Sequence, residues 1–259
     1  MTTRIQQIWD YRIFLSSIVG KEFKVRYSQS VLGVAWLVVE PLLLVLTLST
    51  IFTLIGRTGP GGAPFPVFFY AGLLPWQIFA SALSKGTTCF VSDKSLMHKI
   101  PFPKEISVVK ALATYYIDFL FACISFVGVL IFFRYAPNLN YLYIPLLLLL
   151  IGLLAAGLMF LLGTIHVYIR DIGILAKTLT TVWFWFTPII FYYPFEGPTE
   201  FLYYVNPMAG IIYGFRNIIL FNQPPIPIML ISSLVWISVM FIVGYWLFRR
   251  HERTFADVI

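Results

Sequence analysis

Long apolar runs, separated by short polar segments, organise the chain from residue 31 onward. A helix that crosses a membrane needs about 20 predominantly apolar residues, because the hydrocarbon core of a bilayer is about 30 Å thick. Six segments reach that length and are predicted as transmembrane spans: 31–56, 65–84, 106–133, 141–168, 172–193 and 226–248. The pattern therefore predicts an all-α polytopic membrane protein with six transmembrane helices, forming a single domain over residues 1–259.

Residues 4–28, before the first span, have a mixed pattern. Apolar side chains such as Ile8, Leu15 and Val19 recur at helical spacing, and basic residues lie between them. The same basic residues leave no uninterrupted apolar core of the kind a signal peptide has. We predict an amphipathic helix at the cytoplasmic membrane surface, where basic side chains meet anionic lipid.

The segment 201–221 is apolar and about as long as a span, but Asn206-Pro207 interrupts it. Proline lacks an N–H group and disfavours the helical conformation of the residue before it. The segment is interpreted as two short helices that enter the outer leaflet and return, shielded there by protein or facing a water-filled cavity. A single helix lying on the membrane surface is the alternative.

Composition supports the membrane class. Only 11% of the 259 residues are charged, 59% are hydrophobic, and the mean hydropathy is +0.86. A soluble domain has about 25% charged residues, so this chain cannot cover a water-facing surface. The net charge of +7 is attributed to membrane topology rather than to a nucleic-acid partner.

The distribution of that charge predicts the orientation. If both termini are cytoplasmic, 15 of the 18 lysines and arginines fall in inner segments, and only Arg57, Arg134 and Arg216 lie outside. Basic residues concentrate on the cytoplasmic side of membrane proteins. A seventh crossing by 201–221 would move Arg249 and Arg250 outside, against that rule. Both termini are therefore predicted to be cytoplasmic.

The chain has no phosphate-binding loop, no zinc-protease motif and no nucleophile elbow. Cys89 and Cys123 lack metal or redox spacing, and the three histidines are far apart in the sequence. No catalytic residue, metal site or cofactor is predicted in this chain. A membrane enzyme acting on lipid-linked sugars is accordingly the weakest of the functions considered.

Two acidic residues, Glu40 and Asp118, fall inside predicted spans without an obvious basic partner in a span. Intramembrane acids relay protons in ion-coupled carriers, but they also make structural hydrogen bonds within bundles. Both interpretations stay open, and a secondary carrier remains an alternative function.

Aromatic residues form 18% of the chain. Many are expected at the headgroup level, but Trp183 lies about 16 Å along its span, near the bilayer centre. Aromatic faces and the indole N–H group suit stacking against sugar rings, while lipid contact or core packing explains any single residue equally well. The predicted substrate-path aromatics are Trp183, Trp185, Phe191 and Tyr192.

The stretch "SDKSLMHKIPFPKE" (92–105) is a basic, proline-marked interruption between the second and third spans. A short helix that ends at Pro101 and Pro103 would dock into a groove on a cytoplasmic partner. On spacing alone, a solvated loop whose lysines only set the topology is equally compatible.

Several stretches together resemble the membrane subunit of type-2 ABC exporters for surface polysaccharides, the Wzm-like group. They are "KEFKVRYSQSVLGVAWLVVEPLLLVL" (21–46), "YAGLLPWQIFASAL" (70–83), "SLMHKIPFPKE" (95–105), "YIRDIGIL" (168–175) and "WFWFTPIIFY" (183–192). The resemblance covers essentially the whole chain. Glu40 departs from it, since an amide often precedes this proline in the family.

The resemblance implies a homodimer in which each subunit binds a separate ATPase subunit, and ATP and Mg are bound by that partner. Residues 4–28 would be an interface helix and 95–103 a coupling helix seated in the ATPase. The coupling residues would be Leu96, Met97, His98, Lys99, Ile100 and Phe102. Residues 201–221 would be re-entrant outer-gate helices, with Asn206, Pro207 and Arg216 as gate residues.

The implied cargo is O-antigen polysaccharide on an undecaprenyl pyrophosphate lipid, moved across the bacterial inner membrane. Lys24, Arg26 and Tyr27 are the residues that would meet the pyrophosphate. Capsular polysaccharide and teichoic acid are alternative cargoes, because close relatives export them.

Overall fold

The computed structural model describes residues 4–28, 30–100, 102–192, 197 and 200–258. All regular secondary structure within these ranges is helical. Five helical stretches are long and apolar enough to cross a membrane: Gly33–Leu54, Phe65–Lys99, Glu105–Phe132, Leu139–Tyr168 and Pro227–Thr254. The predicted class, an all-α polytopic membrane protein, is confirmed.

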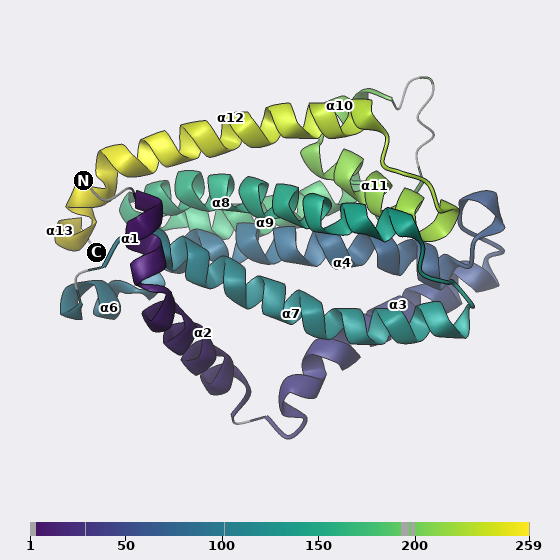
Figure 1. The fold of residues 1–259 in the computed structure, drawn as a ribbon, viewed down its shortest axis with the longest axis horizontal. Helices are drawn as coiled ribbons and strands as arrows, with labels where there is room; N and C mark the ends of the chain where they lie inside the picture. Colours follow the sequence, from purple (N-terminus) through teal and green to yellow (C-terminus); the bar gives the residue numbers. More distant parts are fainter. Residues whose placement is uncertain (1–3, 29, 101, 193–196, 198–199, 259) are drawn as a thin grey trace.

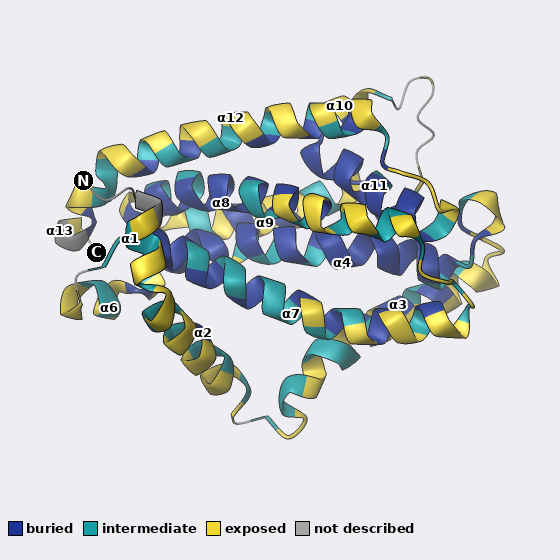
Figure 2. Ribbon diagram, in the orientation of Figure 1, coloured by how far each residue is buried: buried dark blue, intermediate teal, exposed yellow. Residues whose placement is uncertain are grey.

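The long helices lie along the long axis of the molecule (Figure 1). They are α3 (Trp36–Leu54), α4 (Phe65–Ser84), α7 (Glu105–Phe132), α8 (Ile144–Tyr168) and α12 (Pro227–His251). Helix α4 is the centre of the bundle, because most of its side chains are buried while α3 and α12 expose much of their surface (Figure 2). The core is therefore built around α4, with α7, α8 and α11 packed against it.

Helices α8 and α12 approach very closely. A Cβ atom added to Gly244 would lie 2.2 Å from the carbonyl oxygen of Gly157, so neither backbone leaves room for a side chain there. Because lipid tails are as apolar as leucine, close backbone packing replaces the hydrophobic effect as the force that joins helices in a membrane.

The predicted fifth span differs from the structure. Helix α9 (Asp171–Phe186) has 16 residues and is about 24 Å long at 1.5 Å per residue, shorter than the hydrocarbon core. It ends because Thr187, which precedes Pro188, is extended (φ −101°, ψ 135°). The predicted end of this span, Tyr193, lies outside the described residues.

The segment 201–221 forms two helices, α10 (Phe201–Val205) and α11 (Pro207–Phe221), with the break at Asn206. Nearly all of α11 is buried against other helices. The alternative of one surface-lying helix is therefore wrong, and the interruption at Asn206-Pro207 is present as predicted.

Five further helices gather at one end of the bundle, together with both ends of the chain (Figure 1). They are α1 (Arg4–Asp10), α2 (Arg12–Tyr27), α5 (Cys89–Ser92), α6 (Lys94–Lys99) and α13 (Phe255–Val258). We name this the terminal end. The opposite end, with the α3–α4 and α7–α8 connections, is named the loop end. Five 3-10 turns complete the described structure: Gly33–Ala35, Pro60–Gly62, Gly86–Thr88, Leu139–Tyr143 and Glu252–Thr254.

Candidate functional site

The predicted coupling segment, 95–103, is helical only as far as Lys99. Ile100 is extended (φ −134°, ψ 123°), as expected for a residue that precedes a proline. Pro101 lies outside the described residues. The described part of the segment therefore presents about one and a half turns of helix, α6, which ends at the extended residue Ile100.

The six predicted coupling residues divide into two groups. Leu96, Met97 and Phe102 are half-buried, whereas His98, Lys99 and Ile100 are exposed. Ile100 is 40% exposed. Its apolar side chain therefore follows directly on the exposed side chains of His98 and Lys99. This exposed triplet is the part of the segment that is open to a partner.

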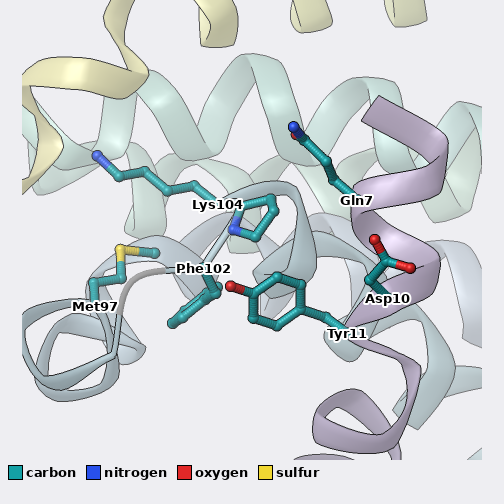
Figure 3. A pocket seen from close by; sticks show the side chains of 7 residues that line it. Gln7, Asp10, Tyr11, Met97, Phe102 and Lys104 are labelled. Carbon is teal, nitrogen blue, oxygen red and sulfur yellow. The ribbon is translucent and has the colours of Figure 1, made fainter. Parts of the chain in front are cut away.

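A pocket of about 590 Å³ is lined on one side by α1 and the α1–α2 junction, and on the other by Met97 and the residues that follow α6 (Figure 3). Tyr11 and Phe102 point toward each other across it, with Met97 beside them (Figure 3). Next to the pocket, the ring of Phe14 lies 5.6 Å from the ring of Phe102. The predicted interface helix thus packs directly on the predicted coupling segment.

The C-terminal tail completes this assembly. The Lys104 ammonium donates a hydrogen bond to the carbonyl oxygen of Glu252 and lies 5.3 Å from the ring centre of Phe255. Phe255 is fully buried against Phe90 and Phe248. Three segments far apart in the sequence, the N-terminal helices, the α6 region and the tail, therefore form one surface at the terminal end.

A chain of alternating charges connects this surface to the bundle. Lys110 bridges Asp93 (2.5 Å) and Glu22 (3.3 Å), and Arg26 bridges Glu22 (3.3 Å) and Asp118 (2.8 Å). We name these five residues the charge chain. Asp118, for which the sequence offered no basic partner in a span, is paired with Arg26 of α2, which lies outside the predicted spans.

The predicted pyrophosphate residues are not equivalent. Lys24 and Arg26 are both exposed, but Arg26 is engaged by two carboxylates. Burial alone would lower the pKa of Arg26, but the charges of Asp118 and its other partners raise it above its ordinary value. Burial raises the pKa of Tyr27, and Asp118 adds to that shift. Arg26 therefore stays charged, but its charge is used in ion pairs with Glu22 and Asp118. Of the two cations in this predicted set, Lys24 is the one left open to a phosphate.

A second pocket at this end, of about 270 Å³, is lined by Arg26, Tyr27, Glu40, Lys85 and Asp118 among others. It brings together both intramembrane acids singled out in the sequence. Two cations and two anions share the space, which makes the pocket close to neutral overall.

At the loop end, Asn206 joins three elements. Its Oδ1 accepts hydrogen bonds from the Met208 backbone N–H and the Trp183 indole N–H, both at 3.0 Å. Its Nδ2 donates to the Phe186 carbonyl (3.2 Å) and to the Thr187 hydroxyl (2.9 Å). The buried amide caps α11 and satisfies the broken end of α9, so the predicted gate residue Asn206 and path residue Trp183 are in contact.

Arg216, which the sequence count placed on the outer side, is buried inside the protein (3% exposed). It donates hydrogen bonds to the carbonyls of Phe68, Pro188 and Ile189, and its guanidinium lies 3.7 Å from the Phe68 ring centre. Gly72 makes the space, since a Cβ there would lie 2.7 Å from the guanidinium. Arg216 therefore fixes the segment after α9 to α4.

The four predicted path aromatics also divide. Trp185 (56% exposed) and Tyr192 (38% exposed) point outward, and Phe191 is half-buried. Trp183 is half-buried, edge-on to Phe79 with ring centres 5.1 Å apart. Trp185, Phe191 and Tyr192 thus keep exposed ring surface, while Trp183 packs within the bundle.

Sequence reasoning missed Glu22, Asp93, Lys110 and Phe14. The signal for one of them was present: Lys110 lies eight residues before Asp118, which places both on one face of the same helix. Among the described residues, no group of three or more His, Cys, Asp or Glu side chains could hold a metal ion.

Comparison with known proteins decides the family. A model of the ABC-2 type transporter membrane family matches residues 14–220. The chain belongs to the ABC-2 type transporter family. Its members are membrane subunits of transporters, and the five candidate spans and the helical bundle are consistent with that membership.

Two of the individual relatives are similar over nearly their full length, and a third over less than half of it. The chain is 25% identical to the O-antigen export system permease protein RfbA of Myxococcus xanthus, over 100% of both chains. It is 27% identical to the protein of the same name from Klebsiella pneumoniae, over 93% of each. The polysialic acid transport protein KpsM of Escherichia coli is 26% identical over 39% of this chain and 40% of its own.

Proposed function

We propose that this chain is the permease subunit of an ABC exporter that moves O-antigen polysaccharide, carried on undecaprenyl pyrophosphate, across the bacterial inner membrane. The subunit acts as a homodimer and is powered by two copies of a separate ATPase, which bind ATP and Mg. The observation that carries this proposal is the full-length similarity to permeases named for O-antigen export.

The terminal end supports the docking of an ATPase. The exposed triplet His98, Lys99 and Ile100 protrudes beside the interface helix, which is held to it by the Phe14–Phe102 contact. A displacement of α6 would be transmitted to α7 through Asp93, which directly precedes α6 and pairs with Lys110 of α7. It would be transmitted to α2 through the pairs that Glu22 and Arg26 make with Lys110 and Asp118. The coupling surface is thus linked to the spans.

The topology in this proposal has six crossings and cytoplasmic termini. Both chain ends and α6 lie at the same end of the bundle (Figure 1), where most of the basic residues also gather. The fifth crossing combines α9 with the segment that follows it, described as far as Tyr192. Apolar side chains such as Leu43 and Leu46 on α3 and Leu179 on α9 remain exposed, available to lipid or to the second subunit.

The proposed cargo path runs from Lys24, exposed at the inner surface, to Trp185, Phe191 and Tyr192. Aromatic faces hold sugar rings without reading one specific glycan. The family assignment does not depend on this path or on the lipid carrier. A capsular polysaccharide could bind the same aromatic side chains through its sugar rings.

The test combines the chain with its ATPase in liposomes and measures ATP-dependent movement of lipid-linked O-antigen. Ile100→Asp places a charge on the exposed apolar triplet, so co-purification of the ATPase and transport should both fall at least about tenfold, a loss of about 1.4 kcal/mol in association. Leu139→Asp, an equally apolar exposed residue at the loop end (86% exposed), is the control and should retain co-purification.

Transport by the purified chain alone, driven by a proton gradient without ATP, would contradict the proposal and favour the ion-coupled carrier. Full ATPase association by Ile100→Asp would show that the triplet is not the docking site.

A further inference from the structure

The loop end carries a pocket of about 570 Å³ between the α3–α4 connection and the segment that follows α9. This volume falls in the range of about 300–1,000 Å³ that is usual for small-molecule sites. Its lining includes Arg57, Thr58, Phe65, Phe191 and Tyr192. None of the described lining residues carries a carboxylate, so the only formal charge among them is the positive charge of Arg57.

The position of Arg57 is set by its backbone. Its N–H group donates to the Phe52 carbonyl at 2.9 Å, which closes the end of α3, and Gly56 takes the left-handed conformation (φ +76°) that this turn needs. The Gly59 N–H donates to the Ala63 carbonyl at 2.8 Å and closes the next turn. The arginine is therefore presented from a hydrogen-bonded turn rather than from an open loop.

The guanidinium of Arg57 lies over two aromatic rings, 5.3 Å from the centre of Phe191 and 5.8 Å from that of Phe52. Within the described ranges no carboxylate forms an ion pair with it. Cation–π contacts leave the N–H edge of a guanidinium available, and that edge matches a carboxylate or phosphate with two parallel hydrogen bonds.

The opposite wall is held by Arg216. Phe68, whose ring lies under that guanidinium, lines the pocket. The carbonyls of Pro188 and Ile189, which Arg216 binds, come directly before the lining residues 190–192. The aromatic wall is thus fixed from inside the subunit, which is what a preorganised binding site requires.

We infer that this pocket is a sugar-binding site selective for a residue that bears an anionic group: the aromatic faces of Phe191 and Tyr192 stack on the ring, and Arg57 binds its carboxylate or phosphate. The inference rests on the proposed export of a polysaccharide and adds to it a preference for acidic glycans at the exit.

The test measures binding of two matched probes to the full chain in nanodiscs of one zwitterionic lipid, by titration calorimetry. One probe is a tetrasaccharide of alternating glucuronate and N-acetylglucosamine, and the other is its carboxyl-reduced neutral form. The native chain should bind the acidic probe about tenfold more tightly than the neutral one, since a charge-assisted bidentate pair contributes on that scale.

Arg57→Gln should abolish that preference while changing the affinity for the neutral probe less than about twofold. Phe191→Leu should weaken both probes equally. The matched control is Arg134→Gln, an exposed arginine of the α7–α8 connection outside the pocket, which should keep the full preference.

The inference is overturned if the native chain binds neither probe, or if Arg57→Gln keeps the preference for the acidic probe. It is also overturned if Arg134→Gln loses the preference equally, because the preference would then come from the overall positive charge of the surface. Because no ATPase is present in this assay, its failure leaves ATP-driven export unaffected. Conversely, loss of export with intact binding would reject the proposed function alone.

Discussion

The two ends of the bundle satisfy their buried polar groups in different ways. At the terminal end, five side chains of alternating charge bind one another, from Asp93 through Lys110, Glu22 and Arg26 to Asp118. At the loop end, Arg216 and Asn206 bind mainly backbone groups, and within the described residues the partners of Arg216 are carbonyls rather than a carboxylate. The terminal end is held by ion pairs between side chains. The loop end is held by side chains that donate hydrogen bonds to backbone carbonyls at and after the end of α9.

This difference corresponds to different mechanical demands. Ion pairs between long side chains that remain partly exposed tolerate displacement, because the side chains can follow a moving helix. Hydrogen bonds to fixed carbonyls are directional and hold one geometry. The break at Pro188 frees carbonyls that, at membrane depth, need donors from the protein. The terminal end is thus suited to transmit movement, and the loop end to hold a wall in place.

The largest effect is expected at the loop end. Arg216→Met leaves the carbonyls of Phe68, Pro188 and Ile189 without their donor, so the free energy of unfolding should fall by about 4 kcal/mol. Detergent-induced unfolding followed by tryptophan fluorescence measures this change. Arg134→Met, at an exposed position of the same end, should change it by less than about 0.5 kcal/mol. Equal stability of both variants would show that the clamp is not needed.

The next effect is expected in the charge chain. Lys110→Met leaves the buried Asp93 carboxylate without its cation, which should cost about 3 kcal/mol in the same measurement. The double variant Lys110→Met with Asp93→Leu removes both charges and should recover most of the loss. A double variant as unstable as the single one would mean that packing, and not charge pairing, explains the effect.

Asn206 should have an intermediate effect at the loop end. Asn206→Ala removes the cap of α11 and the acceptor of the Trp183 N–H, and should cost about 2 kcal/mol. Asn206→Asp retains the acceptor but loses the donor to the Phe186 carbonyl, so its loss should be smaller. The order of the two variants in thermal melting tests this, and the reverse order would contradict the hydrogen-bond assignment.

The smallest effect is expected for Arg26→Gln. The Arg26 side chain is 30% exposed, so its ion pairs should contribute no more than about 1 kcal/mol. The difference from the native chain should shrink between about 0.05 M and about 1 M NaCl, because salt screens exposed pairs. A salt-independent difference would place this pair in a drier environment than its exposure indicates.

The helices were predictable where a strong local signal sets them. The apolar run 65–84 has the same bounds as α4, and the proline at 207 marks the start of α11. The fifth span was predicted too long, because apolar length alone does not show that Pro188 makes Thr187 extended and ends α9 at Phe186.

The candidate site was predictable in part. The sequence singled out the stretch 92–105 and the residues Asn206, Asp118 and Arg216, and the structure shows polar contacts for each of these three residues. It did not show that Asp118 meets Arg26, 92 residues away, nor that Arg216 lies inside the protein, because both facts depend on which helices pack together.

The sequence by itself determined the all-α membrane class, since the length and hydropathy of a segment are local properties that the bilayer reads directly. It also carried the resemblance that the family comparison confirms, but it predicted six spans where five helices are long and apolar enough to cross. Only the tertiary structure decided which charges are paired, which aromatics are open to a ligand and how Arg57 and Phe191 come to share one pocket. The physical reason is that a side chain's partners lie on other helices, and close packing, as between Gly157 and Gly244, selects which faces meet.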